Sequence, residues 1–511
     1  MSGPKPYFSK SKLIAAWQCQ KKLYLDKHHP DLADNSDDRQ AIFDVGHRVG
    51  KIAQDKYGTT DSVEISYSRD SSVMLKDTNE LLAGGIDFPV FEATFEHEGV
   101  LIRADVMIPE GDAWHVIEVK SGASVKDVNK FDAAIQLWVL RGAGLSIKTI
   151  SLAYIDNQFE YQGDGDYDAL IKKEDVTEVA EKLQRAVAAL VVTSAATVMG
   201  DMPDVPVGTH CAAPYACEFQ SVCWPTDGKY PIIGIRGAKK DIFAWVNKGL
   251  KDIRDIPVHE IKGAKREWIY RVTKAGKPEV LAGAKELLEA LLYPRYYLDF
   301  ETTGPAVPLW KGTRPYKHLP VQWSVHIDEG KGDGSLASVR HKEFLDLSGE
   351  APMRALAESL IECLGESGPV LEYTTVVDRV IRQLVDMFPH LQGPLLAIVE
   401  RTVDLADVTK KYYYHPDMQG SWSLKYIGPT VASSIDYKEF GEVNEGMAAA
   451  NFFLEAIDSE TTPERKADLK AKLLKYCWID TAAMVEIVRF FQTVHTQVDG
   501  QKKGWTSSSN P

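Results

Sequence analysis

The spacing of hydrophobic and polar residues divides the first part of the chain into helices and strands. Apolar residues recur at helical spacing over 12–25 and 42–57, which predicts two helices. Between residues 90 and 155 the apolar runs become short or alternating, which predicts strand, hairpin, strand, helix and strand in that order. Another helix is predicted over 176–198, and a segment rich in proline and cysteine follows it.

The same pattern separates a second folded part from a basic middle segment. Residues 236–277 contain twelve Lys or Arg and five Asp or Glu, a net charge of +7. An apolar strand, YYLDF, then begins a new unit, which a long helix over about 468–494 closes. The prediction is an α/β protein with a domain at 1–224, a basic helical connector at 225–290, a domain at 291–498 and a disordered tail at 499–511.

Composition and charge restrict the classes of function. The 511 residues are 44% hydrophobic and 26% charged, as in globular proteins, and six cysteines are too few for a disulfide framework. The net charge of −14 argues against a surface that is basic all over, so any nucleic-acid site must be a local patch. No apolar run of eighteen residues and no signal peptide is seen, so we expect a soluble, cytoplasmic protein without a membrane partner.

A carboxylate pair with a lysine is the first candidate site. Asp105 lies in the apolar run VLIRADVMI, and Glu118 and Lys120 flank Val119 on the next predicted strand. A period of two places Glu118 and Lys120 on one face. Two carboxylates and a lysine suit divalent-metal catalysis of phosphodiester hydrolysis, and the alternative is an ordinary charged hairpin surface.

These residues resemble the motif of PD-(D/E)xK nucleases of the RecB and AddB type, including members with an iron-sulfur cluster. The resemblance covers about residues 8–224 and implies a restriction-endonuclease-like fold. Leu140 stands where the family's QxxxY-like motif usually has tyrosine. The resemblance implies that His47, Asp105 and Glu118 are metal ligands, that Lys120 is catalytic and that Gln136 contacts the site or the substrate.

Four cysteines form the second candidate site, with Cys19 near the start and Cys211, Cys217 and Cys223 at the end of the first domain. The iron-sulfur nucleases have one N-terminal and three C-terminal cysteines, so the resemblance implies an iron-sulfur cluster, 4Fe-4S in type, that joins both ends of the domain. Five residues separate Cys211 from Cys217, where the family has two. A zinc site, a redox sensor and unliganded buried cysteines remain alternatives, and the other two cysteines are predicted core residues.

Acidic residues and a tyrosine in the second half form the third candidate site. Asp299 and Glu301 lie two residues apart on a predicted strand, so they share a side. Asp378 begins a predicted helix after another strand, and Tyr476 and Asp480 are four residues apart on one helical face. Four carboxylates in this arrangement suit two divalent cations for in-line phosphoryl displacement, with the tyrosine positioning the water.

This order of motifs resembles the tyrosine-containing branch of the DEDD exonucleases, which implies a ribonuclease H-like fold, Mg²⁺ or Mn²⁺, and removal of nucleotides from 3′ ends. Thr374 replaces the family's usual Asn four residues before Asp378, and Asp404 is the substitute if Asp378 is not the ligand. Over nearly its full length the chain resembles a bacterial family that joins a RecB-like half to a DnaQ-like half.

The predicted function is a metal-dependent nuclease with two active sites that degrades single-stranded DNA or DNA ends, in DNA repair or antiviral defence. The alternatives are an RNA-processing exonuclease and a DNA-end-binding scaffold with one inactive half. The basic middle segment is the predicted path for nucleic acid. Its predicted substrate contacts are Lys239, Lys240, Lys265 and Arg266.

Overall fold

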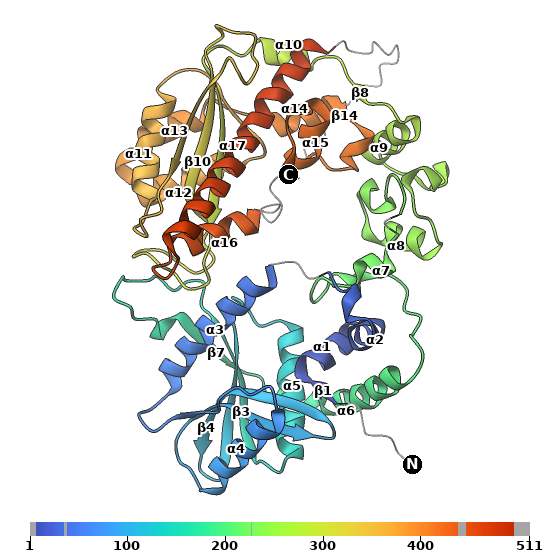
Figure 1. Cartoon of the computed structure of the whole chain (residues 1–511), viewed down its shortest axis with the longest axis vertical. Coiled ribbons are helices and arrows are strands. Elements are labelled where there is room, and N and C mark those ends of the chain that lie inside the picture. The colour runs from blue at the N-terminus through green and yellow to red at the C-terminus, as the bar shows by residue number, and fades with distance from the viewer. Residues whose placement is uncertain (1–6, 35–37, 226, 438–445, 495–511) are drawn as a thin grey trace. The chain divides into compact units, whose positions relative to one another are not determined.

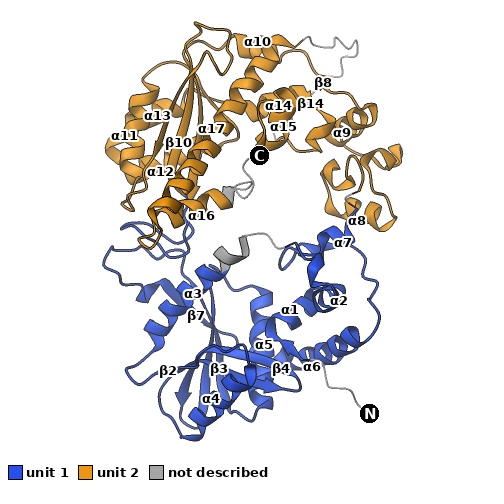
Figure 2. Cartoon of the chain, in the orientation of Figure 1, with its two compact units in different colours: residues 1–226, 304–318 blue, residues 227–303, 319–511 orange. Residues whose placement is uncertain are grey.

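The computed structural model describes residues 7–34, 38–225, 227–437 and 446–494, and it forms two compact units (Figure 1, Figure 2). Unit 1 comprises residues 1–226 and 304–318, and unit 2 comprises residues 227–303 and 319–511. Within the described ranges, no helix is both long enough and apolar enough to span a membrane. Helices and mixed sheets occur in both units, which confirms the predicted α/β class.

Unit 1 is built around a seven-stranded mixed sheet in the order β2-β3-β4-β5-β6-β7, and β1 pairs with β4. Antiparallel pairing joins β3, β4 and β5, and β5 runs parallel to β6. The strands are β1 Phe8–Ser9, β2 Val63–Glu64, β3 Val90–His97, β4 Val100–Glu110, β5 Ala113–Lys120, β6 Ile147–Ile155 and β7 Ile171–Asp175. The α-helices are α1 Lys10–Gln18, α2 Gln20–His28, α3 Asp38–Tyr57, α4 Ser71–Ala83, α5 Asp127–Gly142, α6 Thr177–Met199 and α7 Gln220–Cys223.

Side chains that alternate along β5 build two apolar cores. Val116 packs with residues of α1, α5 and α6, whereas Ile117 packs with Val49 and Ala53 of α3. Helices therefore cover both faces of the sheet. The next two residues in this alternation are Glu118, on the α1 and α5 side, and Val119, on the α3 side.

Unit 2 contains a five-stranded sheet in the order β11-β10-β9-β12-β13. Its first strand, β9, pairs antiparallel with β10 and parallel with β12. The strands are β8 Glu279–Val280, β9 Arg295–Thr303, β10 Leu319–Asp328, β11 Arg340–Leu345, β12 Val370–Glu372, β13 Thr402–Asp404 and β14 Tyr413–Tyr414. The α-helices are α8 Lys239–Asn247, α9 Ala264–Ala275, α10 Ala284–Glu289, α11 Met353–Leu364, α12 Val376–Met387, α13 Gln392–Val399, α14 Leu405–Tyr412, α15 Leu424–Val431, α16 Gly446–Ile457 and α17 Pro463–Thr493.

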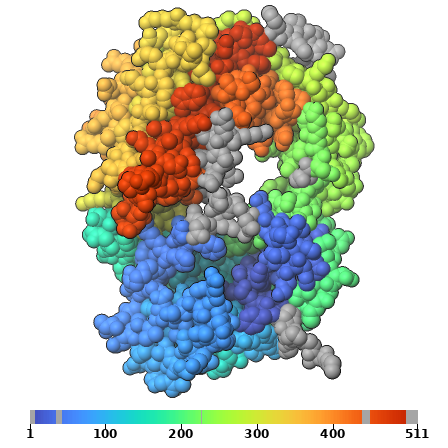
Figure 3. Space-filling view, in the orientation of Figure 1, coloured from blue at the N-terminus to red at the C-terminus, as the bar shows by residue number. Residues whose placement is uncertain are grey.

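The long helix α17 packs against β9 and β10, and α11, α12 and α13 lie along the other side of the sheet (Figure 1). Residues near the end of α17, from Cys477 to Val488, are almost all buried. Its first turns carry charged residues and stay at the surface, where part of the red helix is visible in the space-filling view (Figure 3). The buried half therefore brings its polar side chains against the face of the sheet at β9.

The strand, hairpin, strand, helix and strand predicted over 90–155 are β3, β4, β5, α5 and β6. Two expectations need correction. The helix predicted over 12–25 is two helices, because Cys19 adopts an extended conformation between them. Residues 227–290 belong to unit 2 and form no separate connector, and residues 304–318 return to unit 1. The tail predicted at 499–511 lies outside the described residues.

Candidate active sites

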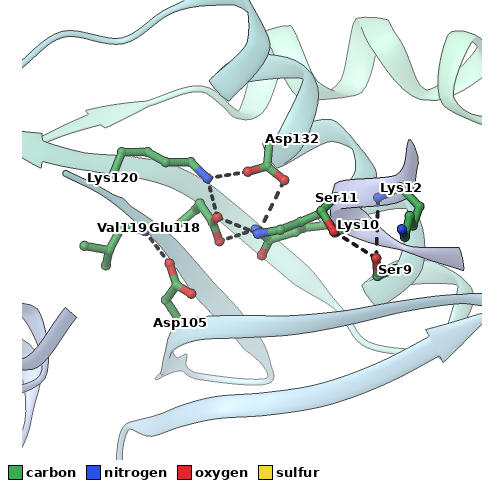
Figure 4. Close-up of polar contacts among 10 residues, drawn as sticks. Ser9, Lys10, Ser11, Lys12, Asp105, Glu118, Val119, Lys120 and Asp132 are labelled. Carbon is green, nitrogen blue, oxygen red and sulfur yellow. Dashed lines mark hydrogen bonds and ion pairs between the residues drawn. The ribbon is translucent and has the colours of Figure 1, made fainter. Parts of the chain in front are cut away.

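Adjacent strands bring Asp105, Glu118 and Lys120 together in unit 1. Asp105 of β4 accepts a hydrogen bond at its Oδ2 from the backbone N–H of Val119 on β5, at 2.6 Å. Lys120 donates through Nζ to Glu118 Oε1 at 2.6 Å, because both side chains lie on the same face of β5 (Figure 4). These three predicted residues thus occupy one site.

Two helices add residues that the sequence analysis missed. Lys10, at the start of α1, donates through Nζ to Glu118 Oε1 at 2.5 Å and lies 3.4 Å from Asp132 Oδ1 of α5 (Figure 4). Asp132 also forms a short ion pair with Lys120. The result is a network in which Lys10 and Lys120 pair with Glu118 and Asp132, and Asp105 lies beside Glu118 on the neighbouring strand.

The electrostatics of this network distinguish its two strand carboxylates. Burial raises the pKa of Asp105 well above its ordinary value, and the negative charge of Glu118 adds to that effect. Burial acts in the same direction on Glu118, but Lys10 and Lys120 outweigh it and lower the pKa of that carboxyl. Although burial opposes it, the charges of Asp132 and Glu118 raise the pKa of Lys120 well above its usual range. Lys120 is therefore an ammonium group at neutral pH.

His47 does not have the surroundings expected of it, and of the two roles expected of Gln136 the structure shows contact with the site. His47 lies on α3 with an exposed side chain, and among the described contacts none joins it to Asp105 or Glu118. Gln136 of α5 is fully buried, and its Nε2 donates a short hydrogen bond to Glu118 Oε2. Gln136 therefore orients the carboxylate from inside the protein and does not face a substrate. Leu140, one turn later, belongs to the apolar core.

The four cysteines of the predicted cluster line one cavity of about 20 Å³. Cys19 lies between α1 and α2, and the Gln18 side chain beside it donates to the carbonyls of His210 and Tyr215 at 2.7 Å each. All four cysteines have free thiols, and burial raises the pKa values of Cys217 and Cys223. Thiols from both ends of the domain thus face one small space.

Carboxylates also gather in unit 2, where Asp299 and Glu301 lie on β9 and Asp480 lies on the buried half of α17. Tyr437 donates to Asp480 Oδ1 at 2.6 Å. Burial raises the pKa of Asp299 and Glu301 well above their ordinary values, and the charge of Asp480 adds to both effects. Burial raises the pKa of Asp480 to about 6, although Tyr437 and Lys425 oppose the shift. When ionised, the buried carboxylate of Asp480 therefore repels the half-buried carboxylates of Asp299 and Glu301.

Tyr476 belongs to the same group of side chains. The charges of Asp480, Glu301 and Asp299 strengthen the effect of burial and raise the pKa of the Tyr476 hydroxyl. Lys425 of α15 lies over its ring, with Nζ 5.6 Å from the ring centroid. Tyr476 therefore keeps its proton and remains a hydrogen-bond donor at neutral pH.

The fourth acidic position differs from the prediction. Asp378 is in the first turn of α12, as expected, but its side chain is 38% exposed and pairs with Arg382 at 2.9 Å. Asp404, the substitute, caps α14 through the N–H of Ala406 at 2.7 Å. Neither forms a described contact with Asp299. Glu372, at the end of β12, was missed: it is buried, and burial raises its pKa to about 7.

The four basic side chains predicted to bind substrate have different environments. Arg266 is buried and donates to Asp241 Oδ2 and to the carbonyl of Arg236, at 2.7 Å each. This corrects the expectation for Arg266, because its guanidinium holds the fold together. Lys265 lies over the Trp422 ring, 4.3 Å from its centroid, and Lys239 and Lys240 are exposed at the start of α8.

Comparisons with known proteins found a match to a family model over part of the chain and remote likenesses to solved structures. The model of DUF2779, a domain of unknown function, matches residues 296–423. The crystal structure of SSO0001 aligns with 44% of this chain and 88% of its own, at 15% identity and a TM-score of 0.21. No curated protein matches. Within the described residues, no three His, Cys, Asp or Glu side chains have the arrangement of a formed metal site.

Proposed function

We propose that the protein is a metal-dependent nuclease with two active sites, which degrades single-stranded DNA or DNA with free ends. In this proposal unit 1 is a PD-(D/E)xK restriction-endonuclease-like domain and unit 2 a ribonuclease H-like DEDD exonuclease domain. DNA repair and defence against foreign DNA are the processes that such an activity serves.

The observation that carries this proposal is the convergence of Asp105, Glu118 and Lys120 on adjacent strands of unit 1. The alternative is that these are ordinary charges on the surface of a hairpin. Such charges have no reason to be buried. Glu118 is 2% exposed and takes part in a hydrogen-bonded network from three elements. Buried and strongly perturbed carboxylates are typical of functional sites.

In this proposal the residues of the site have different roles in phosphodiester hydrolysis. Lys10 and Lys120 keep Glu118 ionised and Gln136 fixes its position, so it is a ready oxygen ligand. Burial and the charge of Glu118 raise the pKa of Asp105, although Lys10 and Lys120 oppose the shift, and a bound cation would favour its ionised form. A Mg²⁺ or Mn²⁺ ion bound by this pair would lower the pKa of a water and polarise the phosphate. Lys120, which stays protonated, stabilises negative charge on the phosphoryl oxygens and is no general base.

The second site has the donor set for the same class of cation. Asp480 is buried, Asp299 and Glu301 are half-buried, and the charge of Asp480 adds to the raised pKa values of both strand carboxyls, an effect that a divalent cation would offset. Tyr476 is a protonated donor that positions a water or a phosphate oxygen. The central place of β9 in its mixed sheet supports the proposed fold.

We propose that a thiolate-bound cofactor binds where the four cysteines line one cavity. Cys19, Cys211, Cys217 and Cys223 supply the four thiolates that an iron-sulfur cluster or a zinc ion requires. The cofactor would hold the N-terminal helices against the end of unit 1, which is a structural role.

The test is cleavage of single-stranded DNA that carries a separate label at each end, with Mg²⁺, Mn²⁺ or EDTA. Wild type is compared with Glu118→Gln and Asp299→Asn, which keep side-chain size and remove one carboxylate from each site. We expect each variant to lose a different set of products. Arg382→Gln, a surface change in unit 2, is the control and should cleave like wild type. Cleavage that neither carboxylate variant alters, or its absence with either cation, would contradict the proposal.

The second candidate function is RNA processing by an exonuclease. Carboxylate sites of this kind hydrolyse the phosphodiester backbone of RNA as well as that of DNA. An RNA of the same sequence in the same assay separates the two substrates. Faster cleavage of the RNA would change the substrate class and leave the assigned residues unchanged.

A further inference from the structure

A cavity of about 600 Å³ opens beside the acid–lysine network of unit 1. Its wall begins with Ser121, the residue after Lys120, and continues with Asn157 and Gln158 beyond the end of β6. Residues 314–317 complete the wall, and they belong to unit 1 although the sequence on both sides of 304–318 belongs to unit 2. The volume is that of a small-molecule or nucleotide site.

The chemistry of the wall favours an anionic ligand. Arg314 and Lys317 supply two cations and Asn157 and Gln158 supply amides, and no acid is among the lining residues. Arg314 pairs with Glu160 at 3.0 Å, but these side chains are 43% and 47% exposed, so the pair is weak. In a chain with a net charge of −14, this wall is a local basic patch.

Tyr316 adds a fixed aromatic ring to this wall. Its backbone has a φ of 59°, which is uncommon for a residue other than glycine, and its N–H donates to the carbonyl of Pro305 at 3.0 Å. Its hydroxyl donates a short hydrogen bond to the carbonyl of Ser121. The side chain is nevertheless 37% exposed, so a face of the ring is open to a ligand. Aromatic rings beside basic residues bind unpaired bases by stacking.

We propose that this cavity is a subsite for single-stranded nucleic acid, in which Arg314 and Lys317 bind backbone phosphates and Tyr316 stacks on a base. The strand is thereby held next to the end of β5 that carries Glu118 and Lys120. The inference rests on the proposed nuclease function for its polymer, and it adds a binding element from a segment outside residues 1–226. Because Arg314 and Lys317 would each pair with a phosphate, the affinity for single-stranded nucleic acid should fall with rising salt concentration by a calculable amount.

Binding of a fluorescein-labelled single-stranded DNA to the full chain in EDTA, followed by anisotropy at several salt concentrations, tests the subsite without cleavage. Each phosphate contact with a single strand contributes about 0.7 to the slope of log K against log salt. Arg314→Gln with Lys317→Gln should therefore lower the slope by about 1.4 and weaken binding on the order of tenfold at 0.1 M salt. An RNA of the same sequence shows whether the subsite distinguishes the two backbones.

The control is Lys148→Gln with Lys311→Gln, which removes two exposed cations of unit 1 outside this cavity, one of them paired with Glu110. It should leave the slope unchanged. A strand with 5-iododeoxyuridine should crosslink to the peptide that contains Tyr316, and Tyr316→Leu should abolish that product.

The possible results separate this subsite from the nuclease proposal. Equal slopes for both double variants, crosslinks only elsewhere, or no binding of either oligonucleotide by wild type would overturn the subsite, even if Glu118-dependent cleavage occurs. A slope that depends on Arg314 and Lys317, without any metal-dependent cleavage, would support the subsite and refute the nuclease function.

Discussion

Replacing Asp480 with asparagine should stabilise the protein in the absence of divalent cations while abolishing cleavage by unit 2. Burial raises the pKa of Asp480 from about 4 to about 6, and each unit of pKa corresponds to about 1.4 kcal/mol. Ionisation of this carboxyl therefore lowers the free energy of unfolding by about 3 kcal/mol. Asparagine has nearly the same shape, can still accept the hydrogen bond from Tyr437, and carries no charge.

The sign of the pH dependence follows from the raised pKa. Below about pH 4 the carboxyl is neutral in the folded and unfolded states, so the substitution changes little. Between pH 4 and 6 the Asp480 carboxyl is ionised in the unfolded chain but still largely protonated in the folded one, so wild type loses stability. The stability gained by Asp480→Asn therefore increases over this range and reaches its full value above pH 6. For a unit of this size, about 3 kcal/mol corresponds to a rise in Tm of about 6 to 12 °C.

The assay is thermal and urea unfolding of wild type and Asp480→Asn in EDTA at pH 4.5 and pH 8, with the transition of unit 2 followed separately. Asp378→Asn is the matched control, because it loses a surface pair with Arg382 and should cost at most about 0.5 kcal/mol. Mn²⁺ should stabilise wild type more than Asp480→Asn. Equal or lower stability of Asp480→Asn at pH 8, or a gain of the same size at pH 4.5, would refute the reasoning.

Three further predictions concern unit 1 and the basic segment. Lys10→Gln should lower the free energy of unfolding, measured by urea titration, by about 2 kcal/mol, because the buried carboxylate of Glu118 loses a cation. Lys12→Gln is the control, and because the pair of Lys12 with Asp26 is more exposed, it should lower that free energy by less than about 1 kcal/mol. Cys211→Ser should reduce the iron or zinc found by elemental analysis of purified protein, and Cys363→Ser, outside the cavity, should not. Arg266→Gln should destabilise unit 2 by about 2 kcal/mol with an unchanged salt dependence of DNA binding, and a reduced salt slope would show that it contacts phosphate.

Short-range periodicity was enough to predict the parts of both sites that lie on single elements. The alternation of Glu118, Val119 and Lys120 places two charges on one face of a strand, and the spacing of Tyr476 and Asp480 does the same on a helix. Asp378 shows the limit of this reasoning. Its position in the first turn of α12 was predicted, but the side chain pairs with an arginine one turn later, a local interaction that the sequence already contained.

The residues that were missed depend on tertiary structure. Lys10 lies 108 positions before Glu118, and no local pattern distinguishes it from the neighbouring Lys12. Asp132 and Glu372 did leave a signal, because each is an acid within an otherwise apolar stretch of a buried helix or strand. Burial of an unpaired charge is costly, so such acids indicate a partner elsewhere in the fold.

The helix α1 connects the two candidate sites of unit 1 in a way that the separate motifs did not reveal. Lys10 at its start belongs to the network around Glu118, and Cys19 directly after its end lines the cysteine cavity. Nine residues of helix span about 14 Å, and Trp17 stacks on Phe131, the neighbour of Asp132, with ring centroids 5.0 Å apart. Because a helix transmits displacement along its axis, a cofactor bound at Cys19 would fix the position of the Lys10 ammonium group. Bound in this way, the proposed cofactor would support the acid–lysine network through α1 without taking part in its chemistry.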